Sequence, residues 1–225
     1  FFRTAGWTIP RTRRLRWPRP RPWSREGEQV SGHLVLASGS PRRLTLLRSA
    51  GFEPEVRVPP VDETPLAGED PSAMVQRLAL AKLHSVVVAG ETGLAADTAV
   101  VVDGEGLGKP LVPDRAQQML RLLSGRTHEV VGGIAVRHGG RDAVGVVTTR
   151  VSFRELSDDE IRVYVASGEP LDKAGGYAIQ GGGGRLVTEV DGCRDNVIGL
   201  SLGAALELFS ILGFQPPSRP GGSSL

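Results

Sequence analysis

The stretch LVLASGSPRRLTLL, residues 34–47, predicts a short buried strand, a tight turn and the start of a helix. Ser40 suits the N-cap of that helix, Pro41 its first position and Gly51 its end. Arg42 and Arg43 then fall in the first helical turn, where positive charge costs roughly 0.3 kcal/mol or more unless an anion is bound. Unpaired backbone N–H groups and two guanidinium groups at one helix start predict a phosphate site. The alternative is that one or both arginines pair with a surface acid.

Strands and helices alternate on both sides of this stretch. Helices are expected over 70–88, 113–124, 157–168 and 201–212, with proline or capping residues at their starts. In the first of these, Met74, Leu78 and Ala81 share one face. A strand is expected in FEPEVRVPPVDE (52–63) before a proline-rich loop, and another in LAADTAVVVDGEGLG (94–108) before a glycine-rich turn. Two long alternating strands are expected to meet in a hairpin at HGGR (138–141), and the glycine-rich segment 177–192 has strand character. This order predicts an α/β fold with a mixed β-sheet flanked by helices.

The chain of 225 residues suits one α/β domain, which we place at residues 30–214. Residues 1–29 contain eight Arg, two Glu and all three Trp, so the net charge is +6 there and −4 in the rest. No helical or strand period runs through them. We expect a disordered extension, or sequence upstream of a true start at Val30, rather than a nucleic-acid or membrane-binding arm. Residues 215–225 are expected to be a disordered tail.

Composition narrows the functional classes further. No apolar run is long enough to span a bilayer, so no membrane partner is expected. The single cysteine, Cys193, excludes an internal disulfide framework and a cysteine-rich metal site, which is compatible with a reducing cytoplasm. We therefore expect a cytoplasmic protein.

The lysines stand out because 24 of the 27 basic side chains are Arg. Lys82, Lys109 and Lys173 are thus exceptions, and a compact ammonium group reaches phosphates where a guanidinium does not fit. Lys82 has the alternative of a solvated helix face, and Lys173 that of a salt bridge with Asp172. Lys109, in a turn rich in glycine, is the strongest phosphate-binding prediction.

Two acids supply the opposite charge. Glu63 lies in a proline-rich loop, and Asp97 interrupts an apolar strand. Carboxylates among cations suit a divalent cation, Mg²⁺ or Mn²⁺, and attack of water on a phosphoanhydride, with one carboxylate taking the proton. Asp62 is alternatively a loop acid with no role. The four His show no metal-ligand spacing, and neither a P-loop nor a dinucleotide fingerprint is present.

Several motifs together resemble the Maf family of nucleoside triphosphate pyrophosphatases over residues 33–212. They are LASGSPRR, VDE, LALAK, ADT, LGKP, LSGRTHEV, GEPLDKAGGYAIQG and NVIGLSL, in that order. The resemblance implies an elongated mixed sheet with two lobes and a cleft, similar to the inosine triphosphate pyrophosphatase fold. It also implies hydrolysis of a nucleoside triphosphate to its monophosphate and pyrophosphate, a divalent metal and a homodimer, without a nucleic-acid partner.

Residue roles follow from the same resemblance. Asp97 takes the place of the proton acceptor, and Arg42, Thr98 and Gln180 fall where the family sets substrate choice. We further assign Ser38, Arg43, Lys82 and Lys109 to substrate binding, and Glu63 and Asp97 to the metal. SPRR, ADT and AIQG resemble the dTTP/UTP branch, because the 7-methyl-GTP branch has Glu where Gln180 stands. The rivals are a non-catalytic division regulator or nucleic-acid binder, and a 7-methyl-GTP enzyme.

Two positions depart from the family pattern. Asp195 replaces the usual Ser before NV, and Ser201 replaces the usual Pro of an LPL motif. Asp195 would add negative charge near the expected phosphate site, so its direction decides whether it disturbs the site.

Overall fold

A computed structural model describes residues 33–215 of the chain. The predictions for residues 1–29 and for the tail beyond Gln215 lie outside the described residues. Within the described part, no helix is both long and apolar enough to cross a bilayer.

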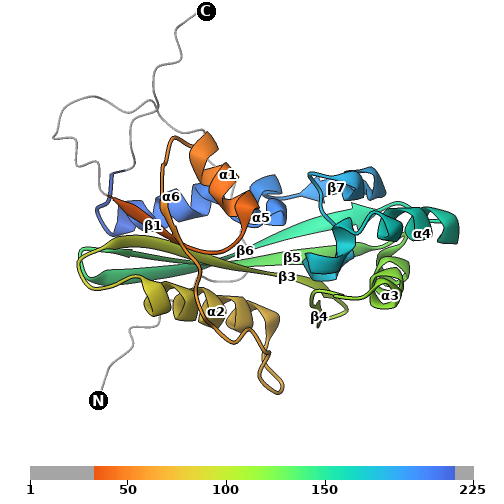
Figure 1. Cartoon of the computed structure of the whole chain (residues 1–225), viewed down its shortest axis with the longest axis horizontal. Helices are drawn as coiled ribbons and strands as arrows, with labels where there is room; N and C mark the ends of the chain where they lie inside the picture. The colour runs from red at the N-terminus through yellow and green to blue at the C-terminus, as the bar shows by residue number, and fades with distance from the viewer. Residues whose placement is uncertain (1–32, 216–225) are drawn as a thin grey trace, which may run out of the picture.

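The centre of the fold is one seven-stranded mixed sheet, ordered β2-β1-β3-β5-β6-β7, with β4 paired to β3. Its strands are β1 (Leu34–Ala37), β2 (Glu55–Arg57), β3 (Thr92–Val102), β4 (Glu105–Leu107), β5 (Thr127–His138), β6 (Arg141–Phe153) and β7 (Val187–Asp191). β1 runs parallel to β2 and β3, whereas the other pairs are antiparallel. The long strands β3, β5 and β6 extend along the molecule (Figure 1). The predicted α/β class with a mixed, elongated sheet is confirmed.

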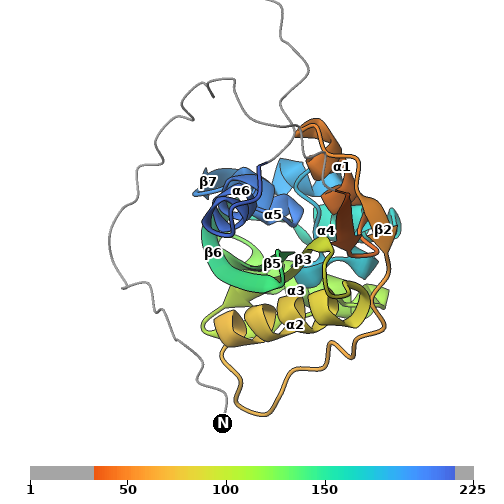
Figure 2. The same cartoon turned by 90° about the vertical axis from the view of Figure 1, so that its left-hand side faces the viewer.

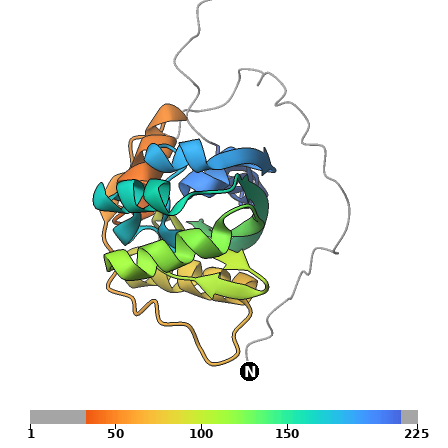
Figure 3. The same ribbon diagram turned by 90° about the vertical axis from the view of Figure 1, so that its right-hand side faces the viewer.

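Helices cover both faces of this sheet. They are α1 (Pro41–Ser49), α2 (Pro71–Val86), α3 (Pro113–Leu123), α4 (Asp158–Ala166), α5 (Arg194–Ile198) and α6 (Leu202–Ile211), with 3-10 turns η1 (Glu169–Asp172), η2 (Ala174–Gly176) and η3 (Gly182–Leu186). α2 packs on one face and α6 on the other (Figure 2). α3 and α4 pack together at the end of the molecule seen in Figure 3. Figure 1 shows α1, α2 and α6 toward one end of the long strands and α3 and α4 toward the other, and we call these two groups the lobes.

Local sequence signals set the helix starts. Pro41, Pro71 and Pro113 each open a helix, where the missing N–H costs no hydrogen bond. Asp70 caps α2 by accepting hydrogen bonds from the backbone N–H groups of Ser72 and Ala73. The predicted capping box of Ser157 and Glu160 is present at the start of α4.

The outer edge of β3 contains a gap in the sheet. β1 pairs with β3 only as far as Ala95, and β4 pairs with it only from Val100. Within the described residues, positions 96–99 of β3 therefore have a strand neighbour on the β5 side alone. Successive side chains of a strand point to opposite faces, so at this gap groups from both faces reach the same space.

Two adjacent glycines of β5 allow helices to approach the sheet at this point. Gly133 pairs with Asp97 and Gly132 with Thr98. A Cβ atom on Gly133 would lie 2.3 Å from the backbone oxygen of Val75 in α2, and one on Gly132 would lie 2.0 Å from the Asn196 side chain in α5. Glycine is thus required on both faces, directly beside the gap.

The predicted helix over 70–88 is present as α2. Its buried residues are Val75, Leu78, Ala79, Lys82 and Leu83, so of the three residues predicted to share one face Leu78 is buried and Met74 and Ala81 are partly buried. The apolar pattern alone does not show the burial of Lys82. Close contact with Gly133 turns Val75 and Lys82 inward.

The segment before the domain yields a first prediction. Deletion of residues 1–29 is expected to leave the melting temperature and the catalytic turnover unchanged, because its sequence has no period with which to pack on a core. Thermal unfolding and activity of the truncated and full-length chains check this. A clear drop in either would mean that this segment contacts the domain.

Candidate active site

All nine residues predicted for the site line one cleft of about 1270 Å³. They are Ser38, Arg42, Arg43, Glu63, Lys82, Asp97, Thr98, Lys109 and Gln180. The cleft lies at the β3 gap and is bounded by the start of α1, by α2, by the loop after β2 and by the segment after η2. Residues more than 140 positions apart in the sequence therefore meet in one place.

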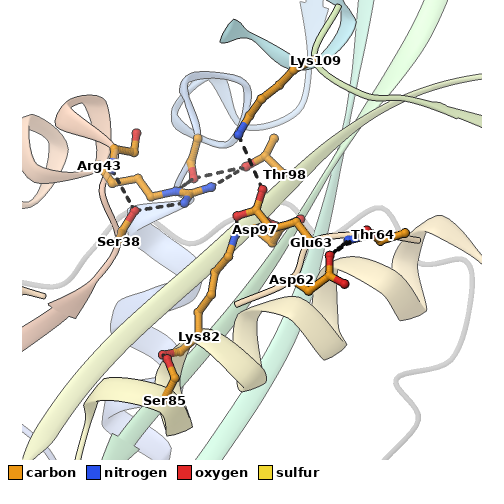
Figure 4. Close-up of polar contacts among 12 residues, drawn as sticks. Ser38, Arg43, Asp62, Glu63, Thr64, Lys82, Ser85, Asp97, Thr98 and Lys109 are labelled. Carbon is orange, nitrogen blue, oxygen red and sulfur yellow. Dashed lines mark hydrogen bonds and ion pairs between the residues drawn. The ribbon is translucent and has the colours of Figure 1, made fainter. Parts of the chain in front are cut away.

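Lys82 lies between two carboxylates at the floor of the cleft (Figure 4). Its Nζ is 2.6 Å from Oδ1 of Asp97 and 2.5 Å from Oε1 of Glu63, and only 5% of the residue is exposed. The alternative of a solvated helix face is therefore wrong for Lys82. Lys109 reaches the other oxygen of Glu63 at 3.5 Å from the more exposed side of the cleft.

The charge state of Glu63 follows from these contacts. Partial burial opposes its ionisation, but hydrogen bonds and ion pairs with Lys82 and Lys109 outweigh burial and lower its pKa below the usual range. The carboxylate is thus ionised at neutral pH and available to a cation.

The two arginines bind neutral groups of the protein. Arg43 donates to the carbonyl of Gly199 at 2.9 Å, to Oγ of Ser38 at 3.1 Å and to Oγ1 of Thr98 at 3.2 Å (Figure 4). Arg42 donates through Nε to the carbonyl of Ile198 at 3.2 Å. Neither forms an ion pair with an acid among residues 33–215, so the surface-pair alternative is wrong for both. Their positive charge remains available to an anion.

Desolvation lowers the pKa of Arg43, and the nearby charge of Asp97 opposes this effect. A guanidinium group stays protonated under such conditions. Arg43 therefore combines an anchored position with a full charge, which is the arrangement that a phosphate site needs.

The β3 gap explains how two sets of partners meet. Asp97 points to the α2 face and contacts Lys82, whereas Thr98 points to the opposite face and contacts Arg43. Asn196 fixes the second face by donating from Nδ2 to the carbonyls of Val130 and Val147, at 2.9 and 3.1 Å. It thereby holds α5, whose end presents the carbonyl of Gly199 to Arg43.

Of the remaining residues singled out in the sequence, Gln180 and Lys173 line the cleft and Asp62 does not. Gln180 lies in an exposed turn that lines the cleft. Lys173 also lines it and pairs with Asp172, as its alternative supposed. Asp62 accepts hydrogen bonds from the backbone and hydroxyl of Thr64 and is absent from the cleft lining, which supports its reading as a loop acid (Figure 4).

The two departures from the family pattern lie outside the cleft lining. Asp195 is in the first turn of α5, where its backbone carbonyl accepts from Gly199 and Leu200. Ser201 caps α6 by accepting a hydrogen bond from the backbone N–H of Ala204. The serine thus supports the start of this helix where the family pattern has a proline. The concern that Asp195 adds charge to the phosphate site is not supported.

The protein side chains of the cleft could hold a divalent cation only together with the phosphates of a bound substrate. Among the described residues, no group of three or more His, Cys, Asp and Glu side chains is arranged to hold a metal. Glu63 and Asp97 supply two carboxylates around one cation, Lys82. Mg²⁺ is commonly held by one or two carboxylates, with phosphates and water as its other ligands. The two acids are therefore compatible with a metal that shares the substrate's phosphates.

Some residues that shape the site were not predicted. Gly132, Gly133 and Asn196 position the helices, and Glu169 holds the turn beside Gln180. A Gly-Gly pair inside an alternating apolar strand was an available signal, because glycine in a strand interior often marks a close approach. Asn196 and Glu169 lie in the quoted motifs NVIGLSL and GEPLDKAGGYAIQG, but no local pattern shows their structural roles, since the backbone groups that they bind are distant in the sequence.

The fold and the cleft define an α/β protein whose cationic and carboxylate side chains converge at a gap in its sheet. Residues 33–212 match the family described as Maf-like protein. The chain belongs to this family, as the sequence motifs predicted.

Similar proteins carry a functional name. The dTTP/UTP pyrophosphatase of Anaeromyxobacter dehalogenans (strain 2CP-C) is 50% identical over 192 residues, which cover 84% of this chain and 98% of that protein. The dTTP/UTP pyrophosphatase of Myxococcus xanthus (strain DK1622) is 50% identical, with 83% and 95% covered. That of Symbiobacterium thermophilum is 44% identical, with 84% and 98% covered.

Proposed function

We propose that this protein is a nucleoside triphosphate pyrophosphatase that hydrolyses dTTP and UTP to the monophosphate and pyrophosphate, with Mg²⁺ or Mn²⁺. The observation that carries the proposal is the pair of carboxylates, Glu63 and Asp97, held by Lys82 in the same cleft as two arginines that form no ion pair with an acid in the described part of the chain. A protein that only binds phosphate gains nothing from acids among its cations. The names of relatives that are about half identical support the same substrates.

In this account the cationic side chains hold the triphosphate. Arg42 and Arg43 lie at the start of α1, whose backbone N–H groups also favour an anion, and Lys109 approaches from the opposite side of the cleft. Ser38 and Thr98 keep the guanidinium of Arg43 in place. Binding from two sides fixes the phosphate chain over the carboxylates.

Asp97 is the group that takes the proton of the attacking water. The water oxygen bonds to the α-phosphorus, the α–β phosphoanhydride bond breaks, and pyrophosphate leaves. Glu63 and Asp97 would hold the cation, which when bound polarises phosphoryl oxygens and lowers the barrier to attack. Lys82 orients both carboxylates, and its contacts help to lower the pKa of Glu63.

Kinetics with a panel of nucleotides tests the proposal. We expect kcat/KM to be highest for dTTP and UTP, lower for CTP and GTP, and activity to vanish with a chelator and return with Mg²⁺ or Mn²⁺. A preference for 7-methyl-GTP would favour the other branch of the family. Absence of turnover with every nucleotide would favour a binding protein. The homodimer stays a prediction, and light scattering of the purified chain measures it.

Gln180 gives a prediction on selectivity. Its amide offers both a donor and an acceptor to a pyrimidine edge, whereas an ionised Glu offers acceptors only. Gln180→Glu should therefore lower kcat/KM for dTTP and UTP by about 1 to 3 kcal/mol of transition-state stabilisation, with a smaller loss for a nucleotide that presents a donor. The measurement is kcat/KM for dTTP, UTP, CTP and GTP.

Gln118→Glu is the matched control, because Gln118 is an exposed glutamine of α3 outside the cleft lining. The same change of charge there should leave all four values unaltered. An equal proportional loss for all four nucleotides in Gln180→Glu would mean that Gln180 supports its turn and does not read the base.

A further inference from the structure

The turn that carries Gln180 is fixed on both sides by two residues outside the predicted site. On one side, the backbone N–H of Ala178 donates to the hydroxyl of Tyr164 at 3.1 Å. On the other side, the N–H groups of Gly182 and Gly183 donate to the carboxylate of Glu169, at 3.0 and 3.2 Å. The hydroxyl of Tyr164 in turn donates to that carboxylate at 2.6 Å. Tyr164 and Glu169 form one anchor, which we call the Tyr164–Glu169 pair.

Two glycines of the run beside Gln180 make room for the Tyr164–Glu169 pair. A Cβ atom on Gly181 would lie 2.3 Å from Oε2 of Glu169, and one on Gly183 would lie 2.7 Å from the hydroxyl of Tyr164. The missing side chains let the carboxylate and the phenol reach the backbone of the turn. Gly181 and Gly183 thus serve contacts within the protein.

The Tyr164–Glu169 pair is held by α4 and by the 3-10 turn η1 that follows it. Tyr164 is a buried residue near the end of α4, and Gly168 then reverses the chain in the left-handed region, with φ of 75°. The backbone N–H of Glu169 donates to Oγ of Ser167. Because α4 and the following turn hold both residues, the anchor belongs to the lobe and not to the turn it fixes.

The charges strengthen these hydrogen bonds. Burial, together with the hydrogen bond to Glu169, raises the pKa of Tyr164, so its hydroxyl remains a donor. Burial opposes ionisation of Glu169, but its bonds from Tyr164, Gly182 and Gly183 outweigh it and lower its pKa. Hydrogen bonds to an ionised carboxylate are about twice as strong as neutral ones.

We propose that Tyr164 and Glu169 are positioning residues for nucleotide selectivity, because they hold the turn 178–183 in the one conformation that directs Gln180 at the base. The inference rests on the proposed function, since it gives Gln180 the task of reading that base. It assigns part of the selectivity to residues that do not line the cleft. The buried phenol of Tyr164 and the carboxylate of Glu169 both bind the backbone of this turn.

The first test is kinetic and uses the full chain. Tyr164→Phe removes the hydroxyl, and Glu169→Gln removes the charge and one acceptor. Each should narrow the ratio of kcat/KM for dTTP to that for CTP by about tenfold, the scale of one charge-assisted hydrogen bond. The loss should appear mainly in KM for dTTP, because Asp97 and its cations remain in place.

Glu160→Gln is the matched control. Glu160 is a carboxylate in the first turn of α4 that also accepts from a backbone N–H, that of Ser157, but it lies at the far end of the helix from the turn. A merely structural effect would lower the melting temperature in all three variants alike. We expect the control to keep the wild-type ratio whatever its melting temperature.

The second test does not depend on activity. Hydrogen–deuterium exchange of the unliganded protein should speed up at least tenfold over residues 178–183 in Tyr164→Phe and Glu169→Gln, and stay unchanged there in Glu160→Gln. Unchanged exchange in both variants would overturn the anchor. Faster exchange with an unchanged nucleotide ratio would overturn its role in selectivity. A wild-type chain that hydrolyses no nucleotide would contradict the proposed function. In that case the exchange rates over residues 178–183 would still test whether Tyr164 and Glu169 hold the turn.

Discussion

Asp97→Asn is expected to lower kcat at least ~100-fold, the lower range for removal of a general base. Asparagine keeps the shape of the side chain and one hydrogen-bond acceptor for Lys82, but it removes the charge that accepts a proton and contacts the metal. Lys82 retains Glu63 as a counter-ion at 2.5 Å, so the fold should lose only about 1 kcal/mol of unfolding free energy. Steady-state kinetics and urea unfolding of the same preparation measure both quantities.

Asp62→Asn provides the matched control for this variant. Asp62 is an acid of the loop that also carries Glu63, but its carboxylate binds Thr64 and does not face the cations. Its kcat should stay within about twofold of the wild type, because a surface group outside the cleft contributes little to the barrier. A folded Asp97→Asn variant with near-normal kcat would remove Asp97 from the mechanism.

Gly133→Ala is expected to cost about 3 kcal/mol or more of unfolding free energy. The new Cβ would lie 2.3 Å from the backbone oxygen of Val75 and 2.9 Å from the backbone nitrogen of Gln76, so α2 itself must shift. The same shift moves Lys82 away from Asp97, and misplacement by a fraction of an ångström in an active site lowers kcat by roughly 10- to 100-fold. Chemical denaturation and kinetics check the two effects.

Gly145→Ala serves as the control in the neighbouring strand β6. A Cβ atom there would meet the Leu208 side chain at 3.5 Å, which is an ordinary van der Waals distance. Its stability should change by less than about 1 kcal/mol, since no backbone has to move. Equal stability of the two variants would show that α2 does not depend on the glycine for its position.

The parts of the fold predicted from sequence are those with a local cause. Asp70 and the Ser157–Glu160 capping box each fix a helix start through hydrogen bonds within a few residues, and Pro41 suits the first position of α1 although the Ser40 side chain makes no capping hydrogen bond. The charges at a helix start, the rare lysines and the two acids, together with the resemblance to the family, predicted nine site residues, and the structure brings those nine to one cleft. Their chemical roles remain predictions until the variants are measured.

The parts that were missed depend on distant partners. α5 spans only Arg194–Ile198, too short for a helical period to be visible, and Asn196 holds it through carbonyls of β5 and β6. The burial of Lys82 was not predicted, because a lysine on the buried face contradicts an apolar pattern, and only the paired acids explain it. The β3 gap arises from where β1 ends and β4 begins, which no single segment encodes.

The products formed from dTTP in the presence of Mg²⁺ show which phosphoanhydride bond the protein hydrolyses. We expect dTMP and pyrophosphate in equal amounts, without dTDP or free phosphate at early times, because the α–β bond is the one that breaks. Separation of the nucleotides by anion-exchange chromatography, with a pyrophosphate assay in parallel, measures this. Formation of dTDP and phosphate, or no product at all from a folded protein, would contradict this expectation.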